Sequence, residues 1–287
     1  MTESFTENAT PGYGFTPAGQ IGNNAGVTSY LYPHHSPVVA KQLIETAQAL
    51  VYPRGVGIYA TDETPEGIEA RLSAAADVKS EVEPLTEEEK KERRKNWRAC
   101  LYGSLPTGGC GIPVFPSKLI EVTIEYISGV ILHSETLIDF NLAPLLTARG
   151  IIPGIRADTD SHPLPISPLE PATQGLDDLL PRLLDAKARG ARFSKWRAPI
   201  LCNASTLPTQ AGLEVQAESL ARFAAISQQA GLVPIVEPDV DFAEDADLKR
   251  SVEVHVKIIN MIFARCATYG VLTEGVHCNI SFLIVRC

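Results

Sequence analysis

The sequence predicts an α/β protein whose parallel strands form an incomplete barrel of about six strand–helix units. Apolar runs of strand length alternate with helical apolar stripes about six times along the 287 residues, which implies a parallel sheet with right-handed crossovers. Polar pairs spaced i, i+2 close successive apolar runs: Arg156 and Asp158, Lys195 and Arg197, and Glu237 and Asp239. Because alternate side chains of a strand share one face, each pair lies on one side of the sheet. Charge at the carboxyl ends of barrel strands indicates an enzyme-like site there.

The first elements are read from composition and periodicity. Residues 1–36 are rich in Gly, Thr, Asn, Ser and Pro, which is typical of a flexible leader. Pro37 favours a helix start, and an apolar helical stripe follows it: Leu43, Ile44, Ala47, Leu50 and Val51. Gly55 begins a short run that we expect to be a buried strand ending at Asp62.

A highly charged segment covers residues 73–98. Thr86 and Glu89 have the spacing of a capping box, which predicts a helix start there. A run of this charge density is most often a solvated face, so we expect a plain exposed helix.

The later segments continue the alternation of strands and helices. Strands are expected at 125–132, 151–157, 193–196 and 232–236, and from Gly270 onward. Helices are expected at 176–188, 213–230 and 247–269, the last with a strong apolar stripe. A complete eight-unit barrel takes roughly 250 residues, and the charged insertion occupies about one unit, so we expect the chain to stop after six strands.

Composition excludes several functional classes. A formal net charge of −9 argues against a non-specific nucleic-acid binder, which needs a basic surface. The chain has no secretory signal pattern and no run of roughly 18 apolar residues, so a membrane location is not expected. The six cysteines lack metal-binding spacing and read as reduced thiols. We therefore expect a cytoplasmic protein without a metal or other cofactor.

Several segments, taken in order, resemble class I fructose-bisphosphate aldolases. These are GIYATDETPEGIEARL, YISGVILHSETL, GIIPGIRAD, ATQGLDDL, ARFSKWR, VPIVEPDVDFAEDADLKR and YGVLTEG. The resemblance covers residues 36–275 and implies a (β/α)8 TIM barrel that cleaves fructose 1,6-bisphosphate, without a cofactor, into dihydroxyacetone phosphate and glyceraldehyde 3-phosphate. The family reaction passes through a Schiff base on a sixth-strand lysine.

The resemblance also implies roles for individual residues. Asp62 looks like the first-strand carboxylate, Lys195 like the fourth-strand lysine that lowers the nucleophile's pKa, and Glu237 like the fifth-strand acid/base. Asp239 stands where the family usually has a second Glu. The catalytic candidates are therefore Asp62, Lys195, Glu237 and Asp239. The phosphate-binding candidates are Arg71, Arg156 and Arg197. Shortly before Arg71, Gly67 stands where the family has a serine, and Arg156 stands where the family has a lysine.

Without the resemblance, simpler interpretations remain open. Lys195 and Arg197 could be salt-bridge partners of Glu237 and Asp239, and the segment Asp62-Glu63-Thr64-Pro65 could be a helix N-cap.

The pattern departs from the family after Gly275. Counting from Glu274-Gly275 puts Asn279 at the place of the Schiff-base lysine, and an amide cannot form an imine. Residues 276–287 resemble nothing in the family, so we expect an apolar non-family tail on a truncated isoform or altered gene product. The neighbouring His277 and Cys278 should point to opposite faces and form no catalytic pair.

Three functions follow as alternatives. The chain could be an aldolase that is severely impaired by Asn279, with a phosphorylated ketose or triose as its substrate. It could be a non-catalytic aldolase-like chain that binds sugar phosphates or associates with intact aldolase subunits, and a homotetramer is possible. It could also be a divergent aldolase for another phosphorylated ketose, as Arg156 and Asp239 suggest.

Overall fold

The computed structural model describes residues 32, 34–52, 55–75, 85–102, 126–243 and 245–279. The expected leader 1–36 lies almost wholly outside these residues, and the tail 276–287 is described only to Asn279. None of the helices in this described part is long and apolar enough to cross a membrane.

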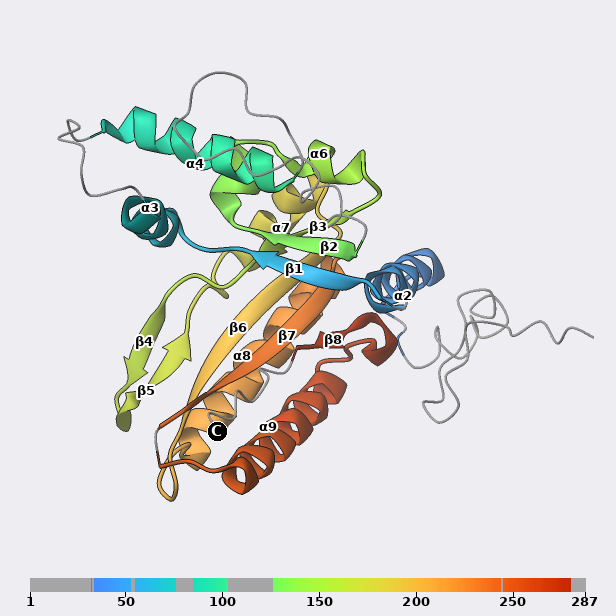
Figure 1. Cartoon of the computed structure of the whole chain (residues 1–287). Coiled ribbons are helices and arrows are strands. Elements are labelled where there is room, and N and C mark those ends of the chain that lie inside the picture. The colour runs from blue at the N-terminus through green and yellow to red at the C-terminus, as the bar shows by residue number, and fades with distance from the viewer. Residues whose placement is uncertain are drawn as a thin grey trace, which may run out of the picture.

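A curled parallel sheet of six strands forms the centre of the molecule (Figure 1), which confirms the predicted incomplete barrel. In sheet order the strands are β1 (Gly57–Thr61), β2 (Ile127–Leu132), β3 (Ile152–Arg156), β6 (Phe193–Cys202), β7 (Val233–Phe242) and β8 (His277–Cys278). The six strands lie in the sheet in the order in which they occur along the chain, and every pair is parallel. A separate antiparallel hairpin, β4 (Ser161–Leu164) and β5 (Ser167–Thr173), follows β3.

Helices pack against both faces of the sheet. Trp196 and Val236 belong to the core that the last two long helices share, and Phe193 and Ile235 belong to the core that the first helix shares. The longer helices are α2 (Pro37–Val51), α3 (Pro65–Ala75), α4 (Glu87–Leu101), α7 (Leu179–Ala188), α8 (Gln210–Gln229) and α9 (Leu248–Thr268). The short ones are a π-helix (Glu135–Asp139), α6 (Ala143–Thr147) and a 3-10 turn (Thr273–Gly275). Helices α8 and α9 lie against β6 and β7 (Figure 1), and together they bury the larger apolar core.

Side chains cap three helices, and two of these helices start at signals that the sequence predicted. Ser36 caps α2 and Pro37 is its first residue, while Thr86 forms the expected capping box of α4. Asp247 accepts a hydrogen bond from Arg250 N at the start of α9. Each of these side chains satisfies a backbone N–H that the first helical turn leaves unpaired.

Glycines allow the strands to close around one buried ring. Phe193 is fully buried, and a Cβ built on Gly154 would lie 2.2 Å from that ring. On the next strand, a Cβ on Gly129 would lie 2.5 Å from Leu50 and 3.1 Å from Phe193. The runs SGV and PGI therefore let α2 and β6 pack directly against the backbone of β2 and β3.

Four expectations about individual elements were wrong. β1 is mostly exposed, because as an edge strand it has a neighbour on one side only, and within it Thr61 alone is buried. The sixth strand is at His277–Cys278 and does not begin at Gly270; Val271 and Leu272 are buried in a non-strand segment.

The other two errors concern strand length and the charged helix. β6 and β7 pair over ten positions, from Phe193 with Val233 to Cys202 with Phe242, so both run well beyond the predicted ends. α4 is not a plain exposed helix, because Arg94 and Arg98 are buried on its inner face.

Candidate active site

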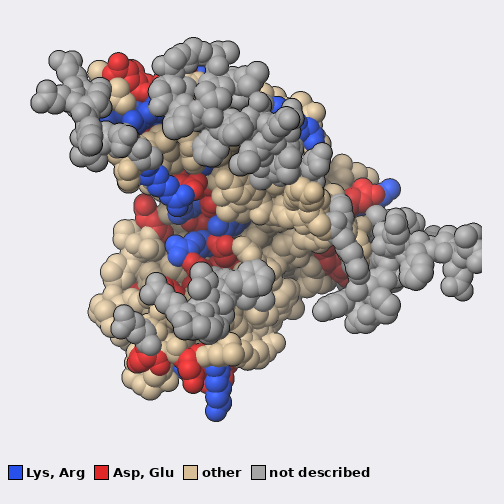
Figure 2. Space-filling view, in the orientation of Figure 1, with Lys and Arg blue, Asp and Glu red and all other residues tan. Residues whose placement is uncertain are grey.

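The site lies where the shorter strands β1 and β3 end, beside the middle of β6 and β7. In the sheet register, Arg156 is opposite Lys195 and Arg197 is opposite Glu237. The sequence had suggested that the polar pairs of β6 and β7 lie at strand ends. They lie within the strands, because β6 and β7 extend further. Figure 2 shows basic and acidic side chains gathered together in a recess on this face of the molecule.

Lys195 is the centre of a buried charge cluster. Its Nζ lies 3.2 Å from Asp62 Oδ2 and 2.8 Å from Glu237 Oε2. The three side chains are only 8%, 14% and 13% exposed, so the attraction between them is weakly screened. Burial opposes the charge on Lys195, but the two carboxylates outweigh it and raise the pKa of that ammonium. Lys195 is therefore held as a cation at neutral pH.

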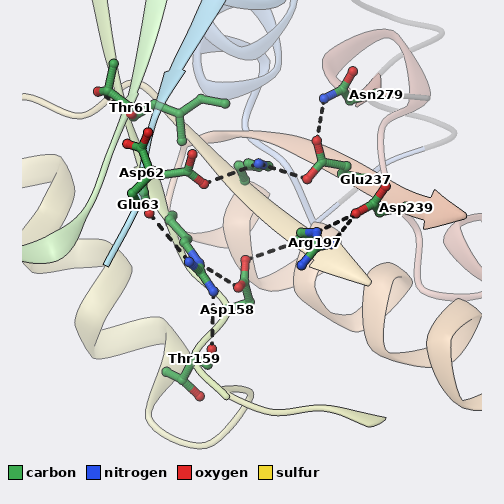
Figure 3. A network of polar contacts seen from close by, with 12 residues as sticks. Thr61, Asp62, Glu63, Asp158, Thr159, Arg197, Glu237, Asp239 and Asn279 are labelled. Atoms are coloured by element: carbon green, nitrogen blue, oxygen red, sulfur yellow. Dashed lines mark hydrogen bonds and ion pairs between the residues drawn. The ribbon is translucent and has the colours of Figure 1, made fainter. Parts of the chain in front are cut away.

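Glu237 has a second partner at the end of β8. Asn279 Nδ2 donates to Glu237 Oε1 at 2.6 Å, and Asn279 N donates to Val236 O at 2.9 Å. Burial raises the pKa of the Glu237 carboxyl, although the neighbouring Lys195 opposes that shift. The amide of Asn279 thus points at Glu237, as Figure 3 shows.

The two arginines of the site are each tied to a carboxylate. Arg156 Nε donates to Asp158 Oδ2 at 2.7 Å, and its other nitrogens reach the carbonyls of Asp62 and Thr159 at 3.4 Å each. Arg197 Nε donates to Asp239 Oδ2 at 2.5 Å (Figure 3). A phosphate that arrives here must therefore compete with carboxylates already in place.

Asp158 is a residue that the candidate set missed. Its side chain is only 3% exposed, and while Oδ2 accepts from Arg156, Oδ1 accepts from the backbone N–H of Arg197 at 3.0 Å. One buried carboxylate thus fixes Arg156 of β3 relative to the backbone of β6. The signal was available, because Asp158 is the second member of the polar pair that closes the β3 run.

Arg71 is not part of the Lys195 cluster. It lies on α3 with its side chain 69% exposed, and its NH1 is 2.9 Å from Glu63 Oε1. Glu63 directly follows Asp62 along the chain, and we call Glu63 and Arg71 the rim of the site. The Glu63 carboxylate thus links Arg71 to the segment that carries Asp62.

The contacts that the simpler interpretations of the sequence predict are present in the structure. The expected salt bridges between Lys195 and Glu237 and between Arg197 and Asp239 do form. The segment from Asp62 to Pro65 also holds a helix N-cap, since the side chain of Thr64 accepts the N–H of Gly67 at the start of α3.

His277 and Cys278 point to different neighbours. His277 Nε2 contacts Ala47 O on α2 at 2.7 Å, whereas Cys278 packs against the larger core. Burial raises the pKa of the Cys278 thiol to about 11, so it is no thiolate nucleophile. Among the described residues, no group of three or more His, Cys, Asp or Glu side chains is placed to share a metal ion.

Comparison with known proteins identifies the family. The family model "Glycolytic: Fructose-bisphosphate aldolase class-I" matches residues 42–284, and so continues beyond Gly275. A probable fructose-bisphosphate aldolase class 1 of Xanthomonas campestris is 35% identical over 249 residues, which are 85% of this chain and 66% of that protein. The fructose-bisphosphate aldolase of Dictyostelium discoideum is 35% identical over 242 residues, 82% of this chain and 60% of that protein.

A solved structure agrees with these sequence matches. A ternary co-crystal structure of fructose-bisphosphate aldolase from Plasmodium falciparum, with TRAP and a small-molecule inhibitor, matches with a TM-score of 0.70 at 31% identity. The match covers 85% of this chain and 64% of that one. The chain belongs to the class I fructose-bisphosphate aldolase family, and it spans about three fifths to two thirds of the length of these relatives.

Proposed function

We propose that this class I aldolase-family chain binds a phosphorylated ketose or triose at the recess formed by β1, β3, β6 and β7, without forming an imine. The observation that carries the proposal is the place of Asn279, whose amide reaches Glu237 where a Schiff-base amine would be needed. An amide nitrogen does not add to a ketone to give an imine, so covalent aldol cleavage stops before its first step.

Lys195 does not replace the missing amine. Nucleophilic attack needs a neutral lysine, and two carboxylates within 3.2 Å hold this one protonated. In this position Lys195 can donate hydrogen bonds to a carbonyl or hydroxyl of a bound sugar. Asp62 and Glu237 can accept hydrogen bonds from the hydroxyl groups of the bound sugar.

Arg197 is the best-placed group for a phosphate. Its side chain is 48% exposed, and a guanidinium can bind a phosphate with two parallel hydrogen bonds. Arg156 is less accessible, at 23%, and is held by the nearly inaccessible Asp158. We expect Arg197 to exchange Asp239 for phosphate more readily than Arg156 exchanges Asp158.

We also place the chain in the cytoplasm. Four cysteines of the described part, Cys100, Cys202, Cys266 and Cys278, are free thiols, which suits a reducing compartment.

Titration of the purified chain with fructose 1,6-bisphosphate by isothermal calorimetry tests the proposal. Arg197→Gln should weaken binding about tenfold or more, because a charge-assisted bidentate contact is lost. Arg189→Gln is the matched control, since Arg189 is an arginine of similar exposure, 39%, directly after α7. Equal affinity of the two variants, or no binding by the unmodified chain, would contradict the proposed site.

A further inference from the structure

Helix α4 places a buried arginine behind the rim of the site. Arg98 is 0% exposed, and its NH1 donates to Glu63 Oε2 at 3.1 Å while its NH2 donates to Glu63 O at 3.0 Å. In the part of the chain that the structure describes, Glu63 is the carboxylate within ion-pair distance of Arg98. Breaking a buried ion pair is strongly destabilising, so Arg98 holds the Glu63 side chain in place.

Glu63 shares its charge between two arginines in different surroundings. Oε2 faces the inaccessible Arg98, and Oε1 faces Arg71, whose side chain is 69% exposed. An exposed ion pair changes an equilibrium constant by at most about fivefold, whereas breaking a buried pair changes it on the order of a hundredfold or more. An incoming anion therefore separates Arg71 from Glu63 at low cost and leaves Glu63 with Arg98.

Further ion pairs fix the helix that carries Arg71. On α3, Glu69 pairs with Arg93 and with Arg94 of α4. Arg94 also makes two hydrogen bonds to Glu135 after β2, at 3.0 and 2.6 Å. The backbone of α3 is thus held against α4, and a ligand needs to move only the Arg71 side chain.

We propose that Glu63 is a positioning residue that holds Arg71 at the rim of the site and releases it to an incoming phosphate dianion, with Arg98 as the buried anchor. The inference rests on the proposed function, that this recess binds a phosphorylated sugar. It adds a role for the charged helix, which otherwise takes no part in the site. It also explains why α4 buries arginines on its inner face.

A thermodynamic cycle on the whole chain tests this role. We would measure fructose 1,6-bisphosphate affinity for the unmodified chain and for the Glu63→Gln, Arg71→Gln and Glu63→Gln/Arg71→Gln variants. Glu63→Gln should bind two- to fivefold more tightly, because it removes an exposed competitor for Arg71. The gain should disappear in the Arg71→Gln background and should shrink at high salt. A merely structural or long-range charge effect would give the same change in both backgrounds and would overturn the proposal.

A second variant covers the possibility that Glu63→Gln unfolds the chain. Glu63→Gln/Arg98→Met removes the buried pair as a unit and leaves no unpaired charge. It should show the same Arg71-dependent gain, with near-ultraviolet circular dichroism as the check on folding. No binding by the unmodified chain would contradict both this inference and the proposed function. Binding with equal affinity across Glu63 variants would contradict this inference alone.

Discussion

Replacement of Lys195 by methionine should destabilise the chain strongly and in a pH-dependent way. The substitution keeps the length of the side chain and removes the cation that lies 3.2 Å from Asp62 and 2.8 Å from Glu237. Two carboxylates that are 14% and 13% exposed would then face each other without a counterion. Removing one partner of a buried pair typically costs about 3–5 kcal/mol, and we expect a loss in this range near pH 8.

The pH dependence follows from Glu237, one of the two carboxyls that remain. Burial already raises the pKa of Glu237, and loss of the opposing Lys195 raises that pKa further. A carboxyl with a folded pKa above its unfolded value is ionised at a cost to the folded state, and this cost grows as the pH rises above the unfolded pKa. The loss of stability should therefore be smaller at pH 5 than at pH 8.

Urea unfolding at the two pH values measures the effect, with Arg197→Met as the matched control. Arg197 is 48% exposed and its partner Asp239 23%, so this variant should lose only about 0–1 kcal/mol. Adding Glu237→Gln to Lys195→Met should restore part of the stability at pH 8. If Lys195→Met lost no more than Arg197→Met, the cluster would not be the buried charge centre described here.

Three further predictions concern packing, helix capping and thiol reactivity. Gly154→Ala should lower the free energy of unfolding, measured in urea, by about 1–3 kcal/mol, because its Cβ would lie 2.2 Å from Phe193. Gly57→Ala is the control and should be nearly neutral, because a Cβ there would have nothing within 4 Å. Thr209→Ala should cost about 1 kcal/mol by removing the cap of α8, and Thr209→Ser should retain the cap; equal losses would contradict this. With its thiol pKa at about 11, Cys278 should react with iodoacetamide at pH 8 far more slowly in the folded chain than in urea, as peptide mapping would show.

The order of strands and helices could be predicted from the sequence because apolar periodicity reports it directly. The polar pairs were informative for the same reason: Lys195 and Glu237 come from adjacent parallel strands and meet as expected. Strand lengths could not be predicted, because the extension of β6 to Cys202 depends on pairing with β7. The exposure of β1 likewise depends on its place at the sheet edge, which no local pattern encodes.

The part of the site that sequence reasoning missed consists of charges with distant partners. Arg98 looked like one residue of a solvated helix, and only the fold brings it to Glu63, 35 positions earlier. The sequence shows how many charged residues the helix has, but it does not show which distant residue each one contacts. Asp158 was visible in its motif, yet its bond to the backbone of Arg197 requires the register of β3 and β6.

Borohydride trapping with dihydroxyacetone phosphate, read by intact mass and peptide mapping, tests the central claim most directly. The unmodified chain should give no adduct, because Asn279 is an amide and Lys195 is protonated. The Asn279→Lys variant returns an amine to the end of β8, within reach of Glu237, and should be trapped at residue 279. An adduct on Lys195 of the unmodified chain would contradict the account, because it would show that a lysine held between two carboxylates still forms the imine.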